Sequence, residues 1–354
     1  MLAAQYNPGK KGLTLKNDYP VPYPGPGQIL LKVAACGVCH SDIAFIDGSV
    51  LPHPLVLGHE ISGYVVKAGE GVAQAFEKDT LYAVLAIHHA SQSLNGLPAL
   101  FDSPGAAYDG GFAHYVLVRP DQLVPVPAGV SPELAAVAAD AGINAYKFVV
   151  RSAQVDSTCK QTVLVIGVGG LGHQAVQIAA HFGATVYACD PKPEAREVAL
   201  KLGAVEAFSP SELETKVAEG FVVNVAMDFV ARKSTFEAAK AALRNNNLSF
   251  PADPRLIVAG MTSETLEFST LDTLTYNLTI LTPQYGSRHD LEAILELYAK
   301  GAVTPVVSSH PLTEINQVLD DLRSGRVLGR TVVIPGEVEQ SSTVNGIRDD
   351  YTRL

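Results

Sequence analysis

The glycine-rich turn at residues 167–172 constrains the fold more than any other part of this sequence. It reads Gly-Val-Gly-Gly-Leu-Gly, follows the apolar run 163–166 and opens a helical pattern over 171–182. A second apolar run, 185–189, comes next. Glycines at these spacings permit a tight turn and let the backbone approach a pyrophosphate, which the helix N-terminus then faces. The order strand, turn, helix, strand therefore predicts a βαβ unit that binds a dinucleotide.

The rest of the chain shows two kinds of sequence pattern. Short β-like runs broken by Gly and Pro, at 28–33, 61–66 and 114–118, predict a compact, mostly antiparallel β domain with long loops. Ser131, followed by Pro, begins a predicted helix that continues to Val150. Beyond the βαβ unit, further strands at 222–229, 255–260 and 278–281 continue the alternation into a doubly wound parallel sheet.

Composition excludes several classes of function. A length of 354 residues allows two domains, and 47% hydrophobic with 18% charged residues is typical of a well-packed soluble protein. The net charge of −10 argues against general binding to nucleic acid or anionic membranes, because both require a basic face. With no signal-like N-terminus and no apolar run of about 20 residues, we expect a cytoplasmic protein whose four cysteines are thiols or metal thiolates.

An acidic residue completes the dinucleotide pattern. Asp190 ends the second strand of the βαβ unit, 18 residues after Gly172. A carboxylate there accepts hydrogen bonds from the adenosine ribose and repels a 2′-phosphate, so NAD(H) is favoured over NADP(H). Two alternatives stay open: Asp190 could merely cap the turn that follows, and the cation Lys192 could meet a phosphate.

Two further clusters, Cys39-His40-Ser41-Asp42 and Gly58-His59-Glu60, precede the turn. In this order the three motifs resemble the zinc-dependent medium-chain alcohol dehydrogenases, over about residues 27 to 336. The resemblance implies an α/β fold: a GroES-like β domain plus a doubly wound parallel-sheet Rossmann domain. It predicts a discontinuous catalytic domain, 1–142 and 287–354, around a dinucleotide-binding domain, 143–286, with the active site between them. A polar tail at 337–354 extends past the family pattern.

A catalytic zinc needs about three protein ligands and one open position. By resemblance, Cys39 and His59 supply two, and Asp140 stands where the family usually has a cysteine. A carboxylate oxygen is an accepted zinc ligand and should leave the ion a harder Lewis acid. The Cys, His, Asp set occurs in the secondary-alcohol dehydrogenase and carbonyl reductase branch. Glu60 corresponds to a carboxylate that approaches the metal when a ligand leaves, so the predicted metal set is Cys39, His59, Glu60 and Asp140.

The same resemblance assigns a proton path, and the general chemistry of metal-bound histidines suggests a role for a nearby carboxylate. Ser41 would pass the proton, and Asp42 would accept the other ring N–H of His59 and fix its tautomer. The histidine that ends the family's relay is replaced by Ala44, which puts alcohol oxidation in doubt more than ketone reduction. Cys36 forms a Cys-x-x-Cys with Cys39, but only Cys39 matches a ligand position, so we expect Cys36 to be packed.

Cofactor contacts are carried over in the same way. The resemblance places one group at the pyrophosphate and another near the nicotinamide. The predicted set is His40 and Arg330 for the pyrophosphate, Asn144, Gly260, Met261 and Gln284 near the nicotinamide, and Gly167, Gly169, Gly170, Leu171, Gly172 and Asp190 for the turn and ribose.

The sequence departs from the family pattern at the site where many members bind a second, structural zinc ion. Many members hold a structural zinc with four closely spaced cysteines, but residues 86–110 contain none. His88, His89 and Asp102 are the only substitutes there, and a solvated or pocket-lining loop is the preferred interpretation. We therefore expect one catalytic zinc per chain and no structural zinc.

The leading hypothesis is a zinc-dependent oxidoreductase that transfers a hydride between NAD(H) and a secondary alcohol, ketone or aldehyde. The alternatives are a biosynthetic reductase of a conjugated C=C or iminium, and a non-catalytic cofactor-binding protein. The expected partners are a small-molecule alcohol or carbonyl substrate and further copies of the chain, as a homodimer or homotetramer paired near 278–281. No nucleic acid and no membrane are expected.

Overall fold

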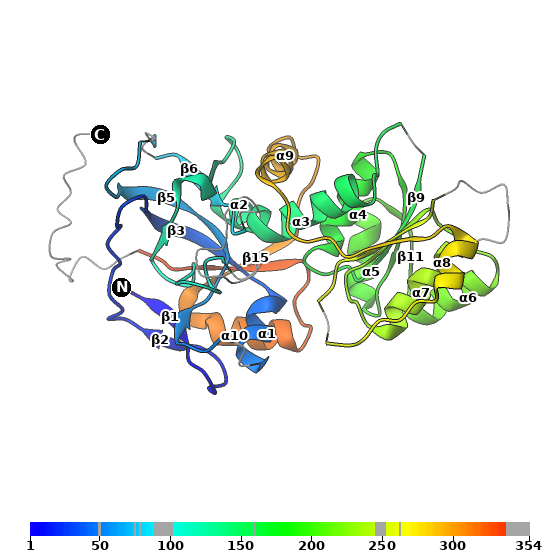
Figure 1. Ribbon diagram of the computed structural model, residues 1–354, viewed down its shortest axis with the longest axis horizontal. Coiled ribbons are helices and arrows are strands. Elements are labelled where there is room, and N and C mark those ends of the chain that lie inside the picture. The colour runs from blue at the N-terminus through cyan, green and yellow to red at the C-terminus, as the bar shows by residue number, and fades with distance from the viewer. Residues whose placement is uncertain are drawn as a thin grey trace.

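The computed structural model describes residues 1–48, 51–73, 76–77, 79–87, 102–158, 160–244, 253–261 and 263–337. The chain forms two parts that lie side by side, each built on its own large β-sheet (Figure 1). Within the described ranges, no helix combines the length and the apolar character needed to cross a bilayer.

A seven-stranded sheet organises the first part, with the order β15-β16-β3-β5-β6-β8 and with β7 also paired to β3. Its strands are antiparallel apart from the pair β15 and β16. Because β15 and β16 come from the C-terminal region, the chain returns to this part after building the second one. The strands are β3 (Ile29–Val38), β5 (Glu60–Ala68), β6 (Leu81–Val84), β7 (Tyr115–Val118), β8 (Leu123–Pro125), β15 (Val307–Pro311) and β16 (Arg330–Ile334).

Smaller elements complete this part. A three-stranded sheet has the order β2-β1-β4, and helices α1 and α10 pack against each other beside it (Figure 1). Their bounds are β1 (Ala3–Tyr6), β2 (Thr14–Lys16), β4 (Leu55–Val56), α1 (His40–Gly48) and α10 (Ile315–Arg323).

The second part is a six-stranded sheet in which every neighbouring pair is parallel. Its order, β11-β10-β9-β12-β13-β14, is 3-2-1-4-5-6 in chain order, which is the doubly wound arrangement that binds dinucleotides, so the predicted Rossmann sheet is confirmed. The strands are β9 (Thr162–Ile166), β10 (Thr185–Cys189), β11 (Ala204–Phe208), β12 (Val225–Asp228), β13 (Arg255–Val258) and β14 (Thr279–Leu281), and the helices are α4 (Gly172–His181), α5 (Pro193–Lys201), α6 (Pro210–Ala218), α7 (Lys233–Leu243) and α8 (Thr270–Tyr276). The next helix, α9 (Arg288–Ala299), contacts β8 of the first sheet and the helical segment that joins the two parts.

A nearly continuous helical segment joins the two parts. It begins as predicted at Ser131, whose side chain accepts a hydrogen bond from the N–H of Leu134 at 3.3 Å. It consists of α2 (Pro132–Val137), a π-helical turn (Ala138–Gly142), α3 (Ile143–Tyr146) and a second π-helical turn (Lys147–Ser152). Most of its buried apolar residues belong to one hydrophobic cluster that contains side chains from both large sheets, so the two parts share a core across this segment. Ala136, Val137 and Ala141 pack instead in a smaller cluster with Ala35 and Val332 of the first sheet.

Candidate active site

Four side chains from distant parts of the sequence meet at one point. Cys39 follows the end of β3, His59 and Glu60 stand at the start of β5, and Asp140 lies in the first π-helical turn. One ligand atom from each of the four lies within 4.8 Å of all the others. Tetrahedral zinc with bonds of about 2.0–2.3 Å holds its ligand atoms roughly 3.5 Å apart, so closing the set around an ion needs movements of about 1 Å. This sulfur, nitrogen and oxygen donor set fits zinc.

The π-helical turn sets the position of Asp140. Tyr285 is buried against this turn, and its hydroxyl donates to the carbonyl oxygen of Ala139 and accepts from the N–H of Ala86 at 3.2 Å. Burial, and next the nearby charge of Asp140, raise the pKa of the Tyr285 hydroxyl, which keeps it protonated as a donor. π-turns inside helices frequently occur at functional sites because they shift the side chains that the helix presents. Tyr285 is not among the site residues predicted from the sequence, because no motif gives a signal for it.

Both oxygens of the Asp140 carboxylate have partners. The side-chain amide of Asn144, one turn further along the helix, donates to Oδ1 at 2.8 Å. Nη2 of Arg330 donates to Oδ2 at 2.8 Å. The amide oxygen of Asn144 is buried beside the cluster and has no hydrogen-bond partner among the residues that the structure describes. Asp140 is thus held from two sides, while Asn144 keeps an acceptor atom available.

Arg330 links the cluster to the glycine-rich turn. Its guanidinium donates through Nε to Glu60 Oε2 at 3.1 Å, and Nη2 bonds to Glu60 Oε1 as well as to Asp140. The opposite nitrogen, Nη1, lies so close to Gly170 that a Cβ there would be 2.7 Å from it. Gly37, the register partner of Glu60, leaves the space that the Glu60 carboxylate fills. The sequence predicted a pyrophosphate contact for Arg330 but not its bonds to two carboxylates.

His59 is surrounded by polar groups. Its Nε2 lies 3.3 Å from Ser41 Oγ and 3.8 Å from Asp140 Oδ2, and its Nδ1 lies 3.5 Å from Asp42 Oδ1. Burial opposes a charge on the ring, but the Asp42 carboxylate, Asp140 and Cys39 outweigh it and raise the pKa of His59 well above its usual value. Asp42 faces Nδ1 of His59 on the side that the sequence expects, although at 3.5 Å its Oδ1 makes no hydrogen bond within the described part of the chain. The N–H of Cys39 donates to Oδ2 at 2.9 Å and fixes the carboxylate in this orientation.

The glycine-rich turn has the close packing that the motif predicts. A Cβ at Gly172 would collide with the carbonyl oxygen of Gly167, so the helix can lie this near the strand only without a side chain. Asp190 is buried, and its carboxylate accepts from the N–H of Val168 at 2.9 Å and from the N–H of Lys192 at 2.9 Å. The bond to Lys192 is the capping role that the sequence left open. The bond to Val168 holds the Asp190 carboxylate against the backbone of the glycine-rich turn.

Cationic groups gather at the end of this turn. Partial desolvation, and next the positive charges of Arg330 and Lys192, lower the pKa of His40. The charges of Arg330 and Lys192 thus act on His40, the residue that the family resemblance assigns with Arg330 to the pyrophosphate. On the nicotinamide side, Gly260 follows β13 and donates its N–H to the carbonyl oxygen of Asp228 at 3.1 Å. Met261 and Gln284 are exposed at the same carboxyl edge of the sheet.

The sequence also gives predictions for cysteines, histidines and an aspartate outside this cluster. Cys36 is fully buried in the core of the first part, and Cys36, Cys39 and Cys189 are free thiols. Burial, and next the charge of Asp42, raise the pKa of Cys36, which agrees with its predicted packing role. His88 and His89 lie outside the described residues. Asp102 is buried, but among the residues described it does not belong to a metal-binding cluster.

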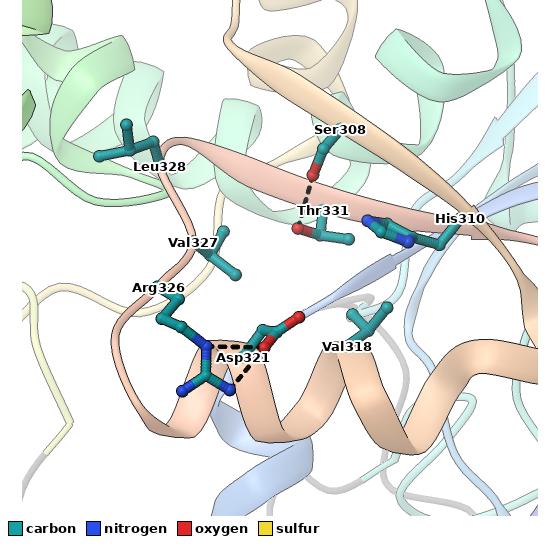
Figure 2. Close-up of a pocket in the computed structure, with 8 residues that line it drawn as sticks. All are labelled: Ser308, His310, Val318, Asp321, Arg326, Val327, Leu328 and Thr331. Carbon is teal, nitrogen blue, oxygen red and sulfur yellow. Dashed lines mark hydrogen bonds and ion pairs between the residues drawn. The ribbon is translucent and has the colours of Figure 1, made fainter.

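Two cavities lie away from the predicted site. One, of about 340 Å³, opens between α10, β15 and β16 (Figure 2). In it Arg326 pairs with Asp321, and the hydroxyls of Ser308 and Thr331 share a hydrogen bond (Figure 2). The other, of about 500 Å³, lies in the first part and includes Asp102 in its lining. None of the predicted metal or cofactor residues lines either cavity.

Comparison with known proteins agrees with the geometry. Residues 25–128 match the family described as alcohol dehydrogenase GroES-like domain, and residues 170–300 match the zinc-binding dehydrogenase family. An alcohol dehydrogenase from Geobacillus stearothermophilus is 31% identical over 94% of this chain and 99% of its own. One from Moraxella sp. is 32% identical over 88% of this chain and 93% of its own.

Solved structures give the same result. The structure of acetophenone reductase from Geotrichum candidum in complex with NAD superposes with a TM-score of 0.80 at 31% identity, covering 94% of this chain and 96% of that one. Sequence and structure thus agree over nearly the whole length. The chain belongs to the zinc-dependent medium-chain alcohol dehydrogenase family, with a GroES-like domain joined to a Rossmann domain.

Proposed function

We propose that this alcohol dehydrogenase is an NAD(H)-dependent enzyme with one catalytic zinc, acting on secondary alcohols, ketones and aldehydes. The observation that carries the proposal is the meeting of Cys39, His59, Glu60 and Asp140, with Arg330 extending from this cluster to the glycine-rich turn. The acetophenone reductase that binds NAD supports ketones as substrates, because it is similar to this chain over nearly its whole length.

The proposed roles follow from position. Zinc at this cluster would supply electrophilic polarisation of a carbonyl or alcohol oxygen, and NAD(H) would supply or accept the hydride. Cys39, His59 and Asp140 would hold the ion. Glu60, whose carboxylate is bonded to Arg330, would approach the ion when one of these ligands leaves. Arg330, His40 and the N-terminus of α4 would bind the pyrophosphate. The free amide oxygen of Asn144 would accept a hydrogen bond from the nicotinamide carboxamide.

Ser41 is the proposed proton carrier. Its hydroxyl lies 3.3 Å from His59 Nε2, so it is beside the atom that would bind the ion. A hydroxyl both donates and accepts, and can therefore pass a proton between the substrate oxygen and a second group. Ala44, at the position of the family's terminal histidine, lies exposed in α1, so we propose that water takes the proton there.

A zinc and turnover measurement tests this proposal. We expect one zinc per chain, together with NADH oxidation on a ketone panel that includes acetophenone and loss of turnover after chelation. NADH-dependent turnover that survives complete removal of metal would instead identify a reductase of a conjugated C=C or iminium. Cofactor binding without turnover on any carbonyl would identify a non-catalytic protein. Two zinc ions per chain would contradict the expectation that there is no structural zinc.

Cofactor choice gives a prediction at Asp190. Asp190→Asn removes the charge that repels a 2′-phosphate while keeping the side-chain shape, so we expect the preference for NADH over NADPH to fall by about tenfold or more. Dissociation constants for both cofactors, measured by protein fluorescence, provide the test. Glu194→Gln is the control, because it removes a negative charge from an exposed position four residues further along the chain. An unchanged preference in Asp190→Asn would show that the carboxylate only caps its turn.

We also propose a homo-oligomer, paired through the edge of the six-stranded sheet. β14 ends this sheet, and beside it α8 exposes Leu271 and Leu274 at 71% and 79%, with Phe268 at 56%. Leucines three positions apart share one helix face, and an exposed apolar group of this kind marks an association surface. The double variant Leu271→Glu/Leu274→Glu should therefore halve or quarter the mass measured by light scattering. Leu200→Glu, on the exposed side of α5, is the control, and a wild-type monomer would reject the proposal.

Two further points complete the proposal. The catalytic domain would comprise 1–142 and 287–354, and the dinucleotide-binding domain 143–286; the return of β15 and β16 to the first sheet supports this division. A cytoplasmic location is supported by the three free thiols, since a reducing compartment keeps cysteines unpaired.

A further inference from the structure

The side chain of His173 connects the glycine-rich turn to the chain that leads into β15. It lies in the first turn of α4 and is fully buried. Its Nδ1 lies 2.7 Å from the carbonyl oxygen of Gly169, and its Nε2 lies 3.1 Å from the backbone nitrogen of Val306. One imidazole thus spans the two parts of the molecule.

The partners define the state of this ring. A carbonyl oxygen only accepts and a backbone N–H only donates, so Nδ1 carries the proton and Nε2 offers its lone pair. Burial lowers the pKa of His173 to about 4, which keeps the ring neutral at physiological pH. Because both nitrogens are used, the ring fixes the spacing between Gly169 and Val306.

A second contact extends this connection to the cluster. The carbonyl oxygen of Val306 accepts from the N–H of Arg330 at 2.9 Å. The guanidinium of Arg330 lies beside Gly170 and bonds to Glu60 and Asp140. His173 therefore reaches the pyrophosphate site in two ways, directly through Gly169 and indirectly through the backbone of Arg330.

Gln174 and Gln177, which follow His173 in α4, each make only one of these two kinds of contact. Gln174 donates to the carbonyl oxygen of Gly170 at 3.0 Å, so it contacts the turn but not the segment before β15. Gln177 donates to the carbonyl oxygen of Thr304 at 3.1 Å and accepts from its N–H at 2.7 Å, so it contacts that segment but not the turn. The carbonyls of Gly169 and Gly170 are both directed at side chains of α4. Turned toward a phosphate, these oxygens would repel it, whereas N–H groups attract it.

We propose that His173 is a positioning residue for the cofactor pyrophosphate, holding the glycine-rich turn and Arg330 at the separation that a diphosphate needs. It does not touch the reacting atoms. It sets the direction of the Gly169 carbonyl and the place of the strand that carries Arg330. This inference rests on the proposed NAD(H)-dependent function.

The test compares two ligands on three variants of the full chain. ADP-ribose contains the diphosphate and adenosine does not, and both are measured by competition with NADH fluorescence. His173→Leu loses both contacts. His173→Gln keeps an amide that can reach the Gly169 carbonyl as Gln174 reaches that of Gly170, but it loses Val306. Gln177→Leu is the matched control, since it loosens the same segment without touching the turn.

We expect His173→Leu to weaken ADP-ribose binding about tenfold or more, the effect of losing a buried hydrogen bond, while adenosine affinity stays within about twofold. His173→Gln should show a smaller loss for ADP-ribose, and Gln177→Leu almost none. Circular dichroism and thermal unfolding check that each variant folds. If His173→Leu does not fold, His173→Gln decides, because a loss confined to ADP-ribose supports the proposal.

Three results would overturn the inference: unchanged ADP-ribose affinity in a folded His173 variant, an equal loss for adenosine, or an equal effect of Gln177→Leu. Each leaves the proposed NAD(H) dependence intact. A wild-type chain that binds neither NADH nor ADP-ribose would instead overturn the proposed function itself, and this inference with it.

Discussion

Asp140→Ala should abolish zinc binding and lower kcat/KM for ketone reduction by on the order of 10³-fold. The substitution removes one of three proposed ligands and leaves His59 and Cys39 to hold the ion, because Arg330 engages the Glu60 carboxylate. Electrophilic catalysis by a bound metal contributes several kcal/mol to stabilising the transition state, and each 1.4 kcal/mol is a factor of ten in rate. Metal content by mass spectrometry and steady-state kinetics with NADH measure the two effects together.

The informative control is Asp140→Cys, which restores the ligand that the family usually has. A thiolate carries the same charge as the carboxylate and binds zinc at about 2.3 Å, so this variant should retain one zinc per chain and show a larger residual activity than Asp140→Ala. It should also bind cobalt less readily, because cobalt prefers the harder oxygen donor. Full zinc occupancy and normal turnover in Asp140→Ala would remove Asp140 from the metal site.

Arg330→Met should destabilise the metal-free protein by about 3–5 kcal/mol. Arg330 is only 3% exposed and bonds to Glu60 and Asp140, which are 0% and 8% exposed. Removing one member of a buried ion pair leaves uncompensated buried charge, and losses of this size are typical. Zinc should reduce the loss, because the ion brings positive charge to the same carboxylates. Urea unfolding of chelated and zinc-loaded protein measures both values.

A surface pair provides the comparison for this effect. Arg326 makes two hydrogen bonds to Asp321, but the side chains are 59% and 30% exposed. Exposed ion pairs contribute about 0–1 kcal/mol, so Arg326→Met should change the unfolding free energy little. Equal effects of the two substitutions would show that Glu60 and Asp140 do not depend on Arg330 for charge compensation.

The sequence predicted the elements whose patterns are local. The glycine-rich turn, β10 and the cap at Ser131 lie at or within a residue of the predicted positions, because turn glycines, apolar runs and capping residues act over a few residues. β11 was not predicted, since this edge strand buries only Ala204 and Phe208 and has weak alternation. The π-helical turns were missed as well, because an apolar helix with 3.6-residue spacing does not reveal where one residue is inserted.

Residue types and their order in the chain were enough to predict a dinucleotide turn, an acid after the second strand and a set of sulfur, nitrogen and oxygen ligands. The tertiary structure alone decided that Arg330 bridges Glu60 and Asp140, that Tyr285 supports the π-helical turn, and that His173 connects the turn to Val306. These contacts join residues more than 100 positions apart. Arg330 and Asp140 meet because β16 returns to the sheet beside β3, and strand order of this kind is fixed by packing of the whole chain, which no local pattern encodes.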